Sequence, residues 1–513
     1  MQDYLKISRA SDLEDKRERA FYKALEMMPG LLSWGSLLLF IVLSIFQPIG
    51  VACFIIVFDL YWFFKTVFFS FHLRKSYLKM KRNEKIDWEK KNIDEYPDKI
   101  KEIYHLIIIP MYNEPLSVVK ESFEALMKTY YDKNKFIVVL ACEERTKNQT
   151  EATAAEIQKE YKDKFFKFFI TWHPGDIVGE IAGKASNETW GARIARQEID
   201  NLGIKYENII FTSLDVDTVV ASHYFGCLTY YYLSSDNPTR YSYQPIPLFV
   251  NNLWESPAIS RIFSFSTTFW QLINQEREGK LLTFSSHSMS FKALSDVDFK
   301  QTNVVSDDSR IFWQCFLKYD GNYDVQPIYY PISMDVNCAE TLTKTLQNIY
   351  KQQRRWAYGA GDIPYFIFNF FKNKRISLAK KISWAREIIE GHWSWACASI
   401  FIFLLLWFPL LLGGEAFNKG LMAHNLPRIT SAILTISMIG LMISAYYNIL
   451  MIPENSPKER KGLKQKIIIL LQWVVTPLIL VFFTSVPAID AQTRLMLGKY
   501  MGFWVTPKSR KEG

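Results

Sequence analysis

Two carboxylates, separated by one residue, directly follow a short apolar run. Asp215 and Asp217 come after the segment 208–214, which has the composition of a buried strand. In open α/β sheets, ligands bind beyond the carboxyl ends of the strands. Carboxylate oxygens suit hard cations such as Mg²⁺ or Mn²⁺, which usually take one or two carboxylates plus substrate phosphates. The pair therefore indicates either a metal site or two solvated turn residues.

A second acidic pair, Asp307 and Asp308, precedes an amphipathic segment at 311–317. Acids at this position stabilise the N-terminus of a helix through its dipole. They are also suited to catalysis, with Asp308 as the general base that takes a proton from an attacking hydroxyl group. Both interpretations require a helix that begins close to Asp307.

A third group, Gln352, Arg355 and Trp356, has the spacing i, i+3, i+4 and shares one face of a helix. The guanidinium group neutralises phosphate, and the indole ring offers a flat apolar face to a sugar ring. The alternative is a basic helix at a membrane surface, with the tryptophan at headgroup level.

The fourth segment, 110–115, ends a buried strand and opens a helix, so its backbone lines the same sheet edge as the first carboxylate pair. Asn113 and Glu114 cap that helix or contact a ligand, and capping is the simpler interpretation.

The surrounding pattern predicts an α/β domain. Segments 106–109 and 136–140 are continuous apolar runs suited to buried parallel strands, and 115–130 has helical spacing between them. Strand, helix and strand form one βαβ unit, and 208–214 supplies a third strand.

Long apolar runs predict membrane spans near 31–47, 50–72, 390–413, 429–452 and 467–486. The first two form a helical hairpin. Basic residues beside the runs follow the positive-inside pattern, which puts the N-terminus and the central domain in the cytosol. The fifth run either crosses once or is broken near Pro477 and Pro487, which returns the basic tail to the inside.

Composition agrees with this organisation. The chain has 513 residues, a net charge of +9, 49% hydrophobic residues and six cysteines without a CxxC pair. The apolar content excludes a disordered protein, and the cysteine spacing argues against a structural zinc site. Because the basic residues cluster beside apolar runs, a lipid bilayer is the expected partner and nucleic acid is not.

Taken together, and in their order along the chain, the four motifs resemble those of membrane-integrated family 2 glycosyltransferases, such as cellulose, chitin and hyaluronan synthases. The resemblance covers about residues 105–360. It implies a cytosolic, Rossmann-like GT-A domain inserted between transmembrane helices. It also implies a nucleotide-sugar donor, such as a UDP- or GDP-sugar, and Mg²⁺ or Mn²⁺ as cofactor.

The resemblance also implies a role for each matching residue. The metal ligands are Asp215 and Asp217, the catalytic pair is Asp307 and Asp308, and Trp356 is an acceptor contact. His287 is either a second acceptor contact or a hydrogen-bonded structural histidine. The donor contacts, from nucleobase to diphosphate, are Pro110, Tyr112, Asn113, Glu114, Glu143, Glu144, Lys184, Asp215, Gln352 and Arg355.

The chain departs from the family pattern at three places. Glu143 and Glu144 replace the usual Asp pair, Asp307 replaces the usual Glu, and 283–290 lacks the family's Phe-Phe-Cys-Gly-Thr-like acceptor loop.

The expected domains are a cytosolic segment, a transmembrane hairpin, the GT-A domain, interfacial helices with QxxRW, C-terminal transmembrane helices and a basic tail. Their boundaries are 1–30, 31–72, 73–340, 341–389, 390–486 and 487–513.

The expected activity is inverting transfer of a sugar to a polysaccharide at the cytoplasmic membrane, as in a processive β-polysaccharide synthase. One alternative is single addition to a lipid-linked acceptor. Another is a transporter or scaffold that only binds nucleotide. A transporter carries functional acids inside its spans. Asp59 in the second run is one such acid, but none stands clearly in the third to fifth runs, which argues against a transporter. Asp59 is instead expected to pair with Lys65 or to face a sugar path.

Overall fold

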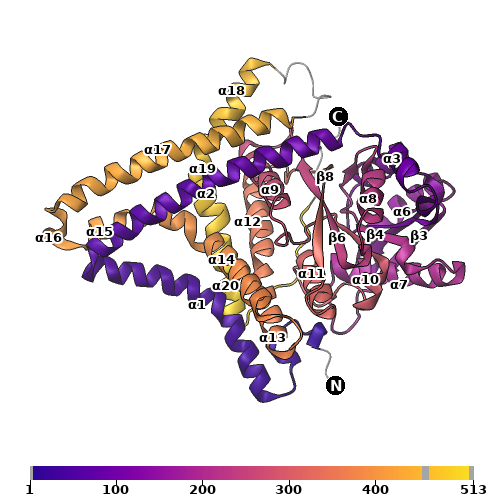
Figure 1. Cartoon of the computed structure of the whole chain (residues 1–513), viewed down its shortest axis with the longest axis horizontal. Helices are drawn as coiled ribbons and strands as arrows, with labels where there is room; N and C mark the ends of the chain where they lie inside the picture. The colour runs from indigo at the N-terminus through magenta and orange to yellow at the C-terminus, as the bar shows by residue number, and fades with distance from the viewer. Residues whose placement is uncertain (1–3, 453–461, 508–513) are drawn as a thin grey trace.

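The computed structural model describes residues 4–452 and 462–507. An α/β domain occupies one side of the molecule, and the long helices α1, α2 and α17 extend together from it toward the other side (Figure 1). The basic residues Lys458, Arg460 and Lys461 and the basic tail from Lys508 lie outside the described residues.

The first half of the domain is a parallel βαβ arrangement. Its strands are β1 (Tyr104–Met111), β2 (Phe136–Glu143), β3 (Lys167–His173) and β4 (Ile209–Ser213). The connecting helices are α5 (Leu116–Lys128), α6 (Lys147–Tyr161) and α7 (Lys184–Leu202). Strand β1 pairs in parallel with both β2 and β4. Alternate residues of β1, such as Ile107 and Ile108, enter the hydrophobic clusters on opposite faces of the sheet. Burial of both faces explains the continuous apolar runs.

The second half extends the sheet to eight strands in the order β3-β2-β1-β4-β7-β6-β8-β5. Its strands are β5 (Val219–Val220), β6 (Tyr241–Phe249), β7 (Ser288–Ser290) and β8 (Asp324–Met334). Its helices are α8 (Tyr224–Leu233), α9 (Ala258–Gln275), α10 (Phe291–Asp296) and α11 (Asp307–Lys318). The pairing of β7 with β4 is antiparallel, so the sheet is mixed. The predicted fold class, an α/β domain between long apolar helices, is confirmed.

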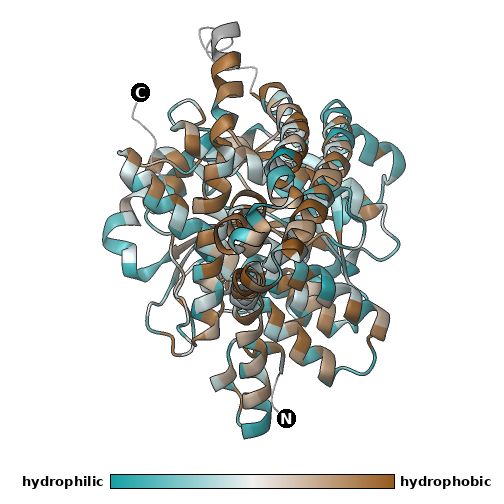
Figure 2. Ribbon diagram, turned by 90° about the vertical axis from the view of Figure 1, so that its left-hand side faces the viewer, coloured by the Kyte–Doolittle hydropathy of each residue, from teal (hydrophilic) through white to brown (hydrophobic). Residues whose placement is uncertain are grey.

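Within the part of the chain that the structure describes, four helical stretches are long and apolar enough to cross a membrane: Lys16–Phe46, Pro48–Asn83, Leu421–Leu450 and Ile467–Met496. The first three are α1, α2 and α17. Helices α1 and α2 meet at Gln47, as expected for a hairpin. Viewed from the side toward which α1, α2 and α17 extend, the helices near the centre consist mostly of hydrophobic residues, while most hydrophilic segments lie farther out (Figure 2).

The run 390–413 differs from the prediction of a single span. It is divided between α14 (Leu378–Phe403) and α15 (Trp407–Leu412). Helix α14 begins well before the run. Because the first part of α14 contains polar residues, the helix is not one of the four stretches that could cross a membrane. The run at 467–486 is irregular around Pro477, where a 3-10 turn precedes α19, and a π-helical turn follows at Val481–Ser485.

The remaining helices complete the chain. They are α3 (Trp88–Glu95), α4 (Lys99–Glu102), α12 (Leu342–Ala357), α13 (Asp362–Lys372), α16 (Gly414–Asn418), α18 (Leu463–Gln472), α19 (Thr476–Leu480) and α20 (Val486–Met496). Helix α13 orients α11, because Asp362 accepts a hydrogen bond from buried Arg310 Nε at 2.7 Å.

The expected pairing of Asp59 with Lys65 is wrong. Lys65 Nζ instead contacts Glu390 Oε1 of α14 at 3.3 Å. The Asp59 side chain is buried in α2, and neither of its carboxylate oxygens has a hydrogen-bond partner among the described residues.

Candidate functional site

A buried lysine joins two acids that are far apart in the sequence. Lys184, the first residue of α7, places Nζ at 2.7 Å from Asp215 Oδ1 and at 3.1 Å from Asp308 Oδ1. Asp215 follows β4 at the carboxyl edge of the sheet, and Asp308 lies in the first turn of α11. The structure therefore brings these three predicted residues together at the edge where α/β sheets bind ligands.

A second lysine, Lys300, lies deeper and connects the same group to α7. Its Nζ is 2.6 Å from Glu188 Oε2, 3.3 Å from Asp308 Oδ1 and 3.5 Å from Asp307 Oδ2. The side chains of Lys300 and Glu188 are both only 1% exposed. We call Lys184, Lys300, Glu188, Asp307 and Asp308 the buried ion network.

The network shifts the pKa values of the two adjacent acids, Asp307 and Asp308, in opposite directions. Burial raises the pKa of Asp307 to about 7, and the neighbouring charge on Asp308 adds to this effect. Burial also opposes ionisation of Asp308, but Lys184 and Lys300 outweigh it and hold the pKa of Asp308 well below its ordinary value. Asp308 is thus the ionised member of the pair, and Asp307 carries the proton in mildly acidic solution.

Asp217 is fully buried. Its Oδ2 accepts a hydrogen bond from the backbone N–H of Asp335 at 2.9 Å, which anchors the carboxylate at the end of β8. Asp215 is the more exposed of the two, with 27% of its side chain accessible. The pair supplies hard oxygen donors at a ligand-binding edge and so fits a divalent cation that also takes phosphate oxygens.

Among residues 4–452 and 462–507, three side chains that could each offer a ligand atom to a metal have these atoms within 4.8 Å of one another only at Asp87, Glu89 and His223. That cluster connects α3 to α8, and Asp87 is exposed. The predicted cation pair therefore lacks a third protein ligand at that spacing.

His287 is enclosed beside the network. Its Nδ1 donates a hydrogen bond to the carbonyl oxygen of Phe284 at 3.0 Å and is 3.8 Å from Asp308 Oδ1. Burial and then the charge on Lys300 lower the pKa of His287 to about 3, so the imidazole is neutral. Because Nδ1 carries the proton, Nε2 is an acceptor, and it has no hydrogen-bond partner in the described part of the chain.

The first-strand segment differs from the capping prediction. Helix α5 begins after Pro115, which makes no side-chain cap. Glu114 instead accepts hydrogen bonds from the backbone N–H groups of Tyr112 and Asn113, at 2.8 and 3.1 Å. Its carboxylate therefore shapes the turn that follows Pro110, the next-to-last residue of β1.

The two glutamates after β2 have different surroundings. Glu143 is buried and forms an ion pair with Arg145, whereas Glu144 is exposed. The Arg145 guanidinium lies 4.5 Å from the centre of the Tyr112 ring, which links this strand end to the β1 turn. Arg145 was not predicted, because its partners lie on different strands.

The three predicted residues of α12 separate into two environments. Gln352 accepts a hydrogen bond from Asn337 at 3.1 Å and lines a small cavity together with Trp356, between α9 and α12. The Trp356 ring contacts Phe284 at a centroid distance of 5.8 Å. Arg355 turns toward the acids, and burial lowers its pKa despite the opposing charges of Asp307, Asp308 and Asp215.

The C-terminal segment also reaches the site. Phe503 lies under the Arg355 guanidinium at 4.7 Å from its ring centre. The same ring contacts Gly183, where a Cβ atom would come within 2.6 Å of Phe503 Cγ. Only glycine fits at position 183, and this contact packs the residue directly before Lys184 against the C-terminal segment that contains Phe503. The described end of the chain therefore lies on the same side of the molecule as the α/β domain.

The family comparison identifies the chain. The family model described as glycosyl transferase family group 2 matches residues 210–486, more than half of the sequence. The chain belongs to this family. The match includes Asp215, the Asp307–Asp308 pair, the α12 residues and the C-terminal helices. The β1 turn, Glu143 and Lys184 of this glycosyltransferase precede it.

Several solved structures resemble the chain at low identity. The mannosyltransferase PcManGT from Pyrobaculum calidifontis, solved with GDP-Man and Mn²⁺, is 14% identical with a TM-score of 0.40; the similarity covers 83% of this chain and 99% of that one. TarS 1–349 from S. aureus, solved with UDP-GlcNAc, is 12% identical with a TM-score of 0.38, covering 67% and 91%. GalNAc-T7, solved with UDP, GalNAc and Mn²⁺, is 9% identical with a TM-score of 0.35, covering 57% and 59%.

These likenesses are distant, and the family model alone establishes the family. A sequence comparison with curated proteins finds no match.

The raised pKa of Asp307 predicts a decline in the stability of this glycosyltransferase as pH rises from about 4 to about 7. Over this window the unfolded chain has released the proton of Asp307 and the folded chain still holds it, so the free energy of unfolding falls. Asp307→Asn is expected to flatten the decline in denaturant titrations at a series of pH values. The control is Asp94→Asn, an exposed position on α3. An unchanged slope in Asp307→Asn would contradict the protonation assigned to Asp307.

Proposed function

We propose that this family 2 glycosyltransferase is an inverting enzyme. It transfers a sugar from a nucleotide-sugar donor, a UDP- or GDP-sugar, to a growing β-polysaccharide at the cytoplasmic face of the membrane. The observation that carries the proposal is the Lys184 bridge between Asp215 and Asp308. It supports a single pocket in which a diphosphate group, an acceptor hydroxyl group and their counter-charges meet.

The pocket has groups suited to a diphosphate. Lys184 and Arg355 supply positive charge beside the acids, and the turn after β1 together with Tyr112 and Arg145 offers surfaces for a nucleobase. Asp215 and Asp217 would hold Mg²⁺ or Mn²⁺, which stabilises the negative charge that develops on the departing diphosphate. Donor binding through these groups is the first requirement of the reaction.

Asp308 is the proposed general base. In the transfer step, an acceptor hydroxyl oxygen forms a bond to the anomeric carbon while the bond from that carbon to the diphosphate oxygen breaks. The hydroxyl proton moves to Asp308, and the electron pair of the broken bond leaves with the nucleoside diphosphate. Attack from the face opposite the leaving group inverts the configuration, so an α-linked donor yields a β-linked product.

The ion network explains how a strongly ionised acid becomes a useful base. Lys184 and Lys300 together lower the pKa of Asp308 against the effect of burial. A bound diphosphate would attract Lys184 away from Asp308. With only Lys300 left beside it, the pKa of Asp308 would rise toward neutral pH. A base is most effective when its pKa lies near the working pH. Donor binding thereby prepares Asp308 for the proton.

Trp356 and Gln352 are proposed to line the acceptor side. They lie against α9, and Phe284 packs against the Trp356 ring. His287 is fully buried, and its Nδ1 lies 3.8 Å from Asp308 Oδ1, so it would act on the acceptor site through Asp308. The long apolar helices, which are suited to a membrane, support an acceptor that is kept at the bilayer.

The direct test is incubation of the detergent-purified chain with a panel of UDP- and GDP-sugars, with Mg²⁺ or Mn²⁺ and with a chelator. One donor is expected to release its nucleoside diphosphate, and chelation should abolish the release. Long products identify a processive synthase, whereas single-sugar products on a lipid identify the alternative acceptor. Failure of every donor to release nucleotide would contradict the transferase activity.

Asp308→Asn is expected to lower kcat by about 10²- to 10⁴-fold, the usual contribution of a general base, while donor affinity survives. Nucleotide release gives kcat, and equilibrium binding of the donor gives the affinity. Asp298→Asn is the matched control, because Asp298 is a partly exposed acid that pairs with Lys6. A kcat equal to that of the wild type would remove Asp308 from this role.

A further inference from the structure

Helix α2 is longer than a membrane requires. Its 36 residues correspond to about 54 Å at 1.5 Å per residue, against roughly 30 Å for the hydrocarbon core of a bilayer. The first two thirds of the helix are almost entirely apolar, and its last turns are basic. The basic turns therefore extend from the lipid boundary toward the α/β domain.

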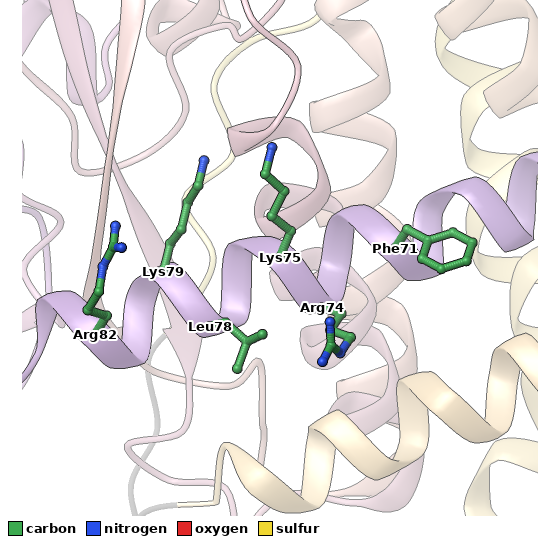
Figure 3. A pocket seen from close by; sticks show the side chains of 6 residues that line it. All are labelled: Phe71, Arg74, Lys75, Leu78, Lys79 and Arg82. Atoms are coloured by element: carbon green, nitrogen blue, oxygen red, sulfur yellow. The ribbon is translucent and has the colours of Figure 1, made fainter.

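A groove with a volume of about 490 Å³ lies along these turns. We call it the α2 basic groove, and its lining residues are Phe71, Arg74, Lys75, Leu78, Lys79 and Arg82. Figure 3 shows Lys75, Lys79 and Arg82 extending to one side of α2, and Arg74 and Leu78 to the other. Phe71 lies at the end nearer the apolar part of the helix.

The groove keeps an excess of positive charge. Lys75 and Lys79 both contact Glu276, at 2.7 and 2.8 Å, so one carboxylate serves two ammonium groups. Arg74 and Arg82 form no ion pair with any residue that the structure describes. The four cations outnumber Glu276 and Glu278, the two carboxylates that act on Lys75, so the groove attracts an anionic ligand.

Apolar surface leads directly into the charged part. Phe71 is 69% exposed and Leu78 is 49% exposed, and they stand among the four cations. The exposed side chains of Phe64 and Phe68 continue this surface toward the middle of α2. A free phosphate ion has no apolar part that could contact such a surface, whereas a phospholipid combines a phosphate with acyl chains. Polybasic segments next to a span attract anionic lipids.

We propose that the α2 basic groove binds the phosphate headgroup of an anionic phospholipid, with the acyl chains along Phe64, Phe68 and Phe71. The inference rests on the proposed location of the enzyme in a membrane, but not on its transferase activity. Arg74 and Arg82 contribute most of the attraction for the headgroup, because their charges are not shared with Glu276. The lipid would fix the position of α2 relative to the α/β domain, which Lys79 contacts through the Tyr329 hydroxyl group at 3.1 Å.

The test compares lipid binding by the full chain in detergent, counted by native mass spectrometry during titration with phosphatidylglycerol or phosphatidylcholine. The wild type is expected to retain phosphatidylglycerol in preference, and Arg74→Gln/Arg82→Gln is expected to lose about tenfold in that affinity. The matched control is Lys81→Gln/Lys85→Gln, which removes the same charge from the same helix end outside the groove. The control should bind as the wild type does.

Three results would overturn the inference. They are equal retention of both lipids by the wild type, equal losses in both double variants, and displacement of phosphatidylglycerol by inorganic phosphate at similar concentration. The last result would identify a soluble anion as the ligand. Gel filtration and nucleotide release in the same preparations verify folding. They also separate this outcome from that of the transferase test, because lipid retention is measured independently of catalysis.

Discussion

The site depends on two ammonium groups enclosed among acids that belong to different parts of the domain. Without Lys184 and Lys300, the charges of Glu188 and Asp308, and of Asp307 once it ionises, would lose their nearest cationic partners in a mostly buried site. Removal of one partner from such a buried set typically costs about 3–5 kcal/mol, because an uncompensated charge remains. The network therefore requires α7 and α11 to approach the end of β4 together.

The same arrangement connects the glycosyltransferase domain to the long helices. Arg355 of α12 faces the acids, and Phe503 joins Arg355 to the glycine before Lys184. Helix α20 leads into that C-terminal segment, and α20 also contacts α12 through an ion pair of Asp490 with Arg354 at 2.9 Å. Helix α20 is therefore in contact, through α12 and the segment with Phe503, with the residues around Lys184 and Arg355.

Much of the fold follows from local patterns in the sequence. Continuous apolar runs indicate β1, β2 and β4 because both faces of this sheet are covered, and 115–130 indicates α5 from its helical spacing. Asp215 and Asp308 stand out because each follows or begins a recognisable element. Local patterns also explain why α1 and α2 form a hairpin at Gln47.

The parts that could not be predicted depend on long-range contacts. Lys300 is a single lysine in a segment without a recognisable motif. Its role in the ion network becomes clear only from its contact with Glu188. Phe503 similarly acquires a role through Gly183 and Arg355. The spacing of Gln352 and Arg355 places them on one face, but their neighbours separate them into different pockets.

A double-mutant cycle between Lys300 and Glu188 tests the central claim most directly. The free energy of unfolding is measured for the wild type, Lys300→Met, Glu188→Gln and the double variant. Groups in direct contact within one ion network usually show coupling of about 0.5–3 kcal/mol, and the 2.6 Å contact predicts a favourable value above about 1 kcal/mol. Additive effects, within about 0.5 kcal/mol, would contradict the account.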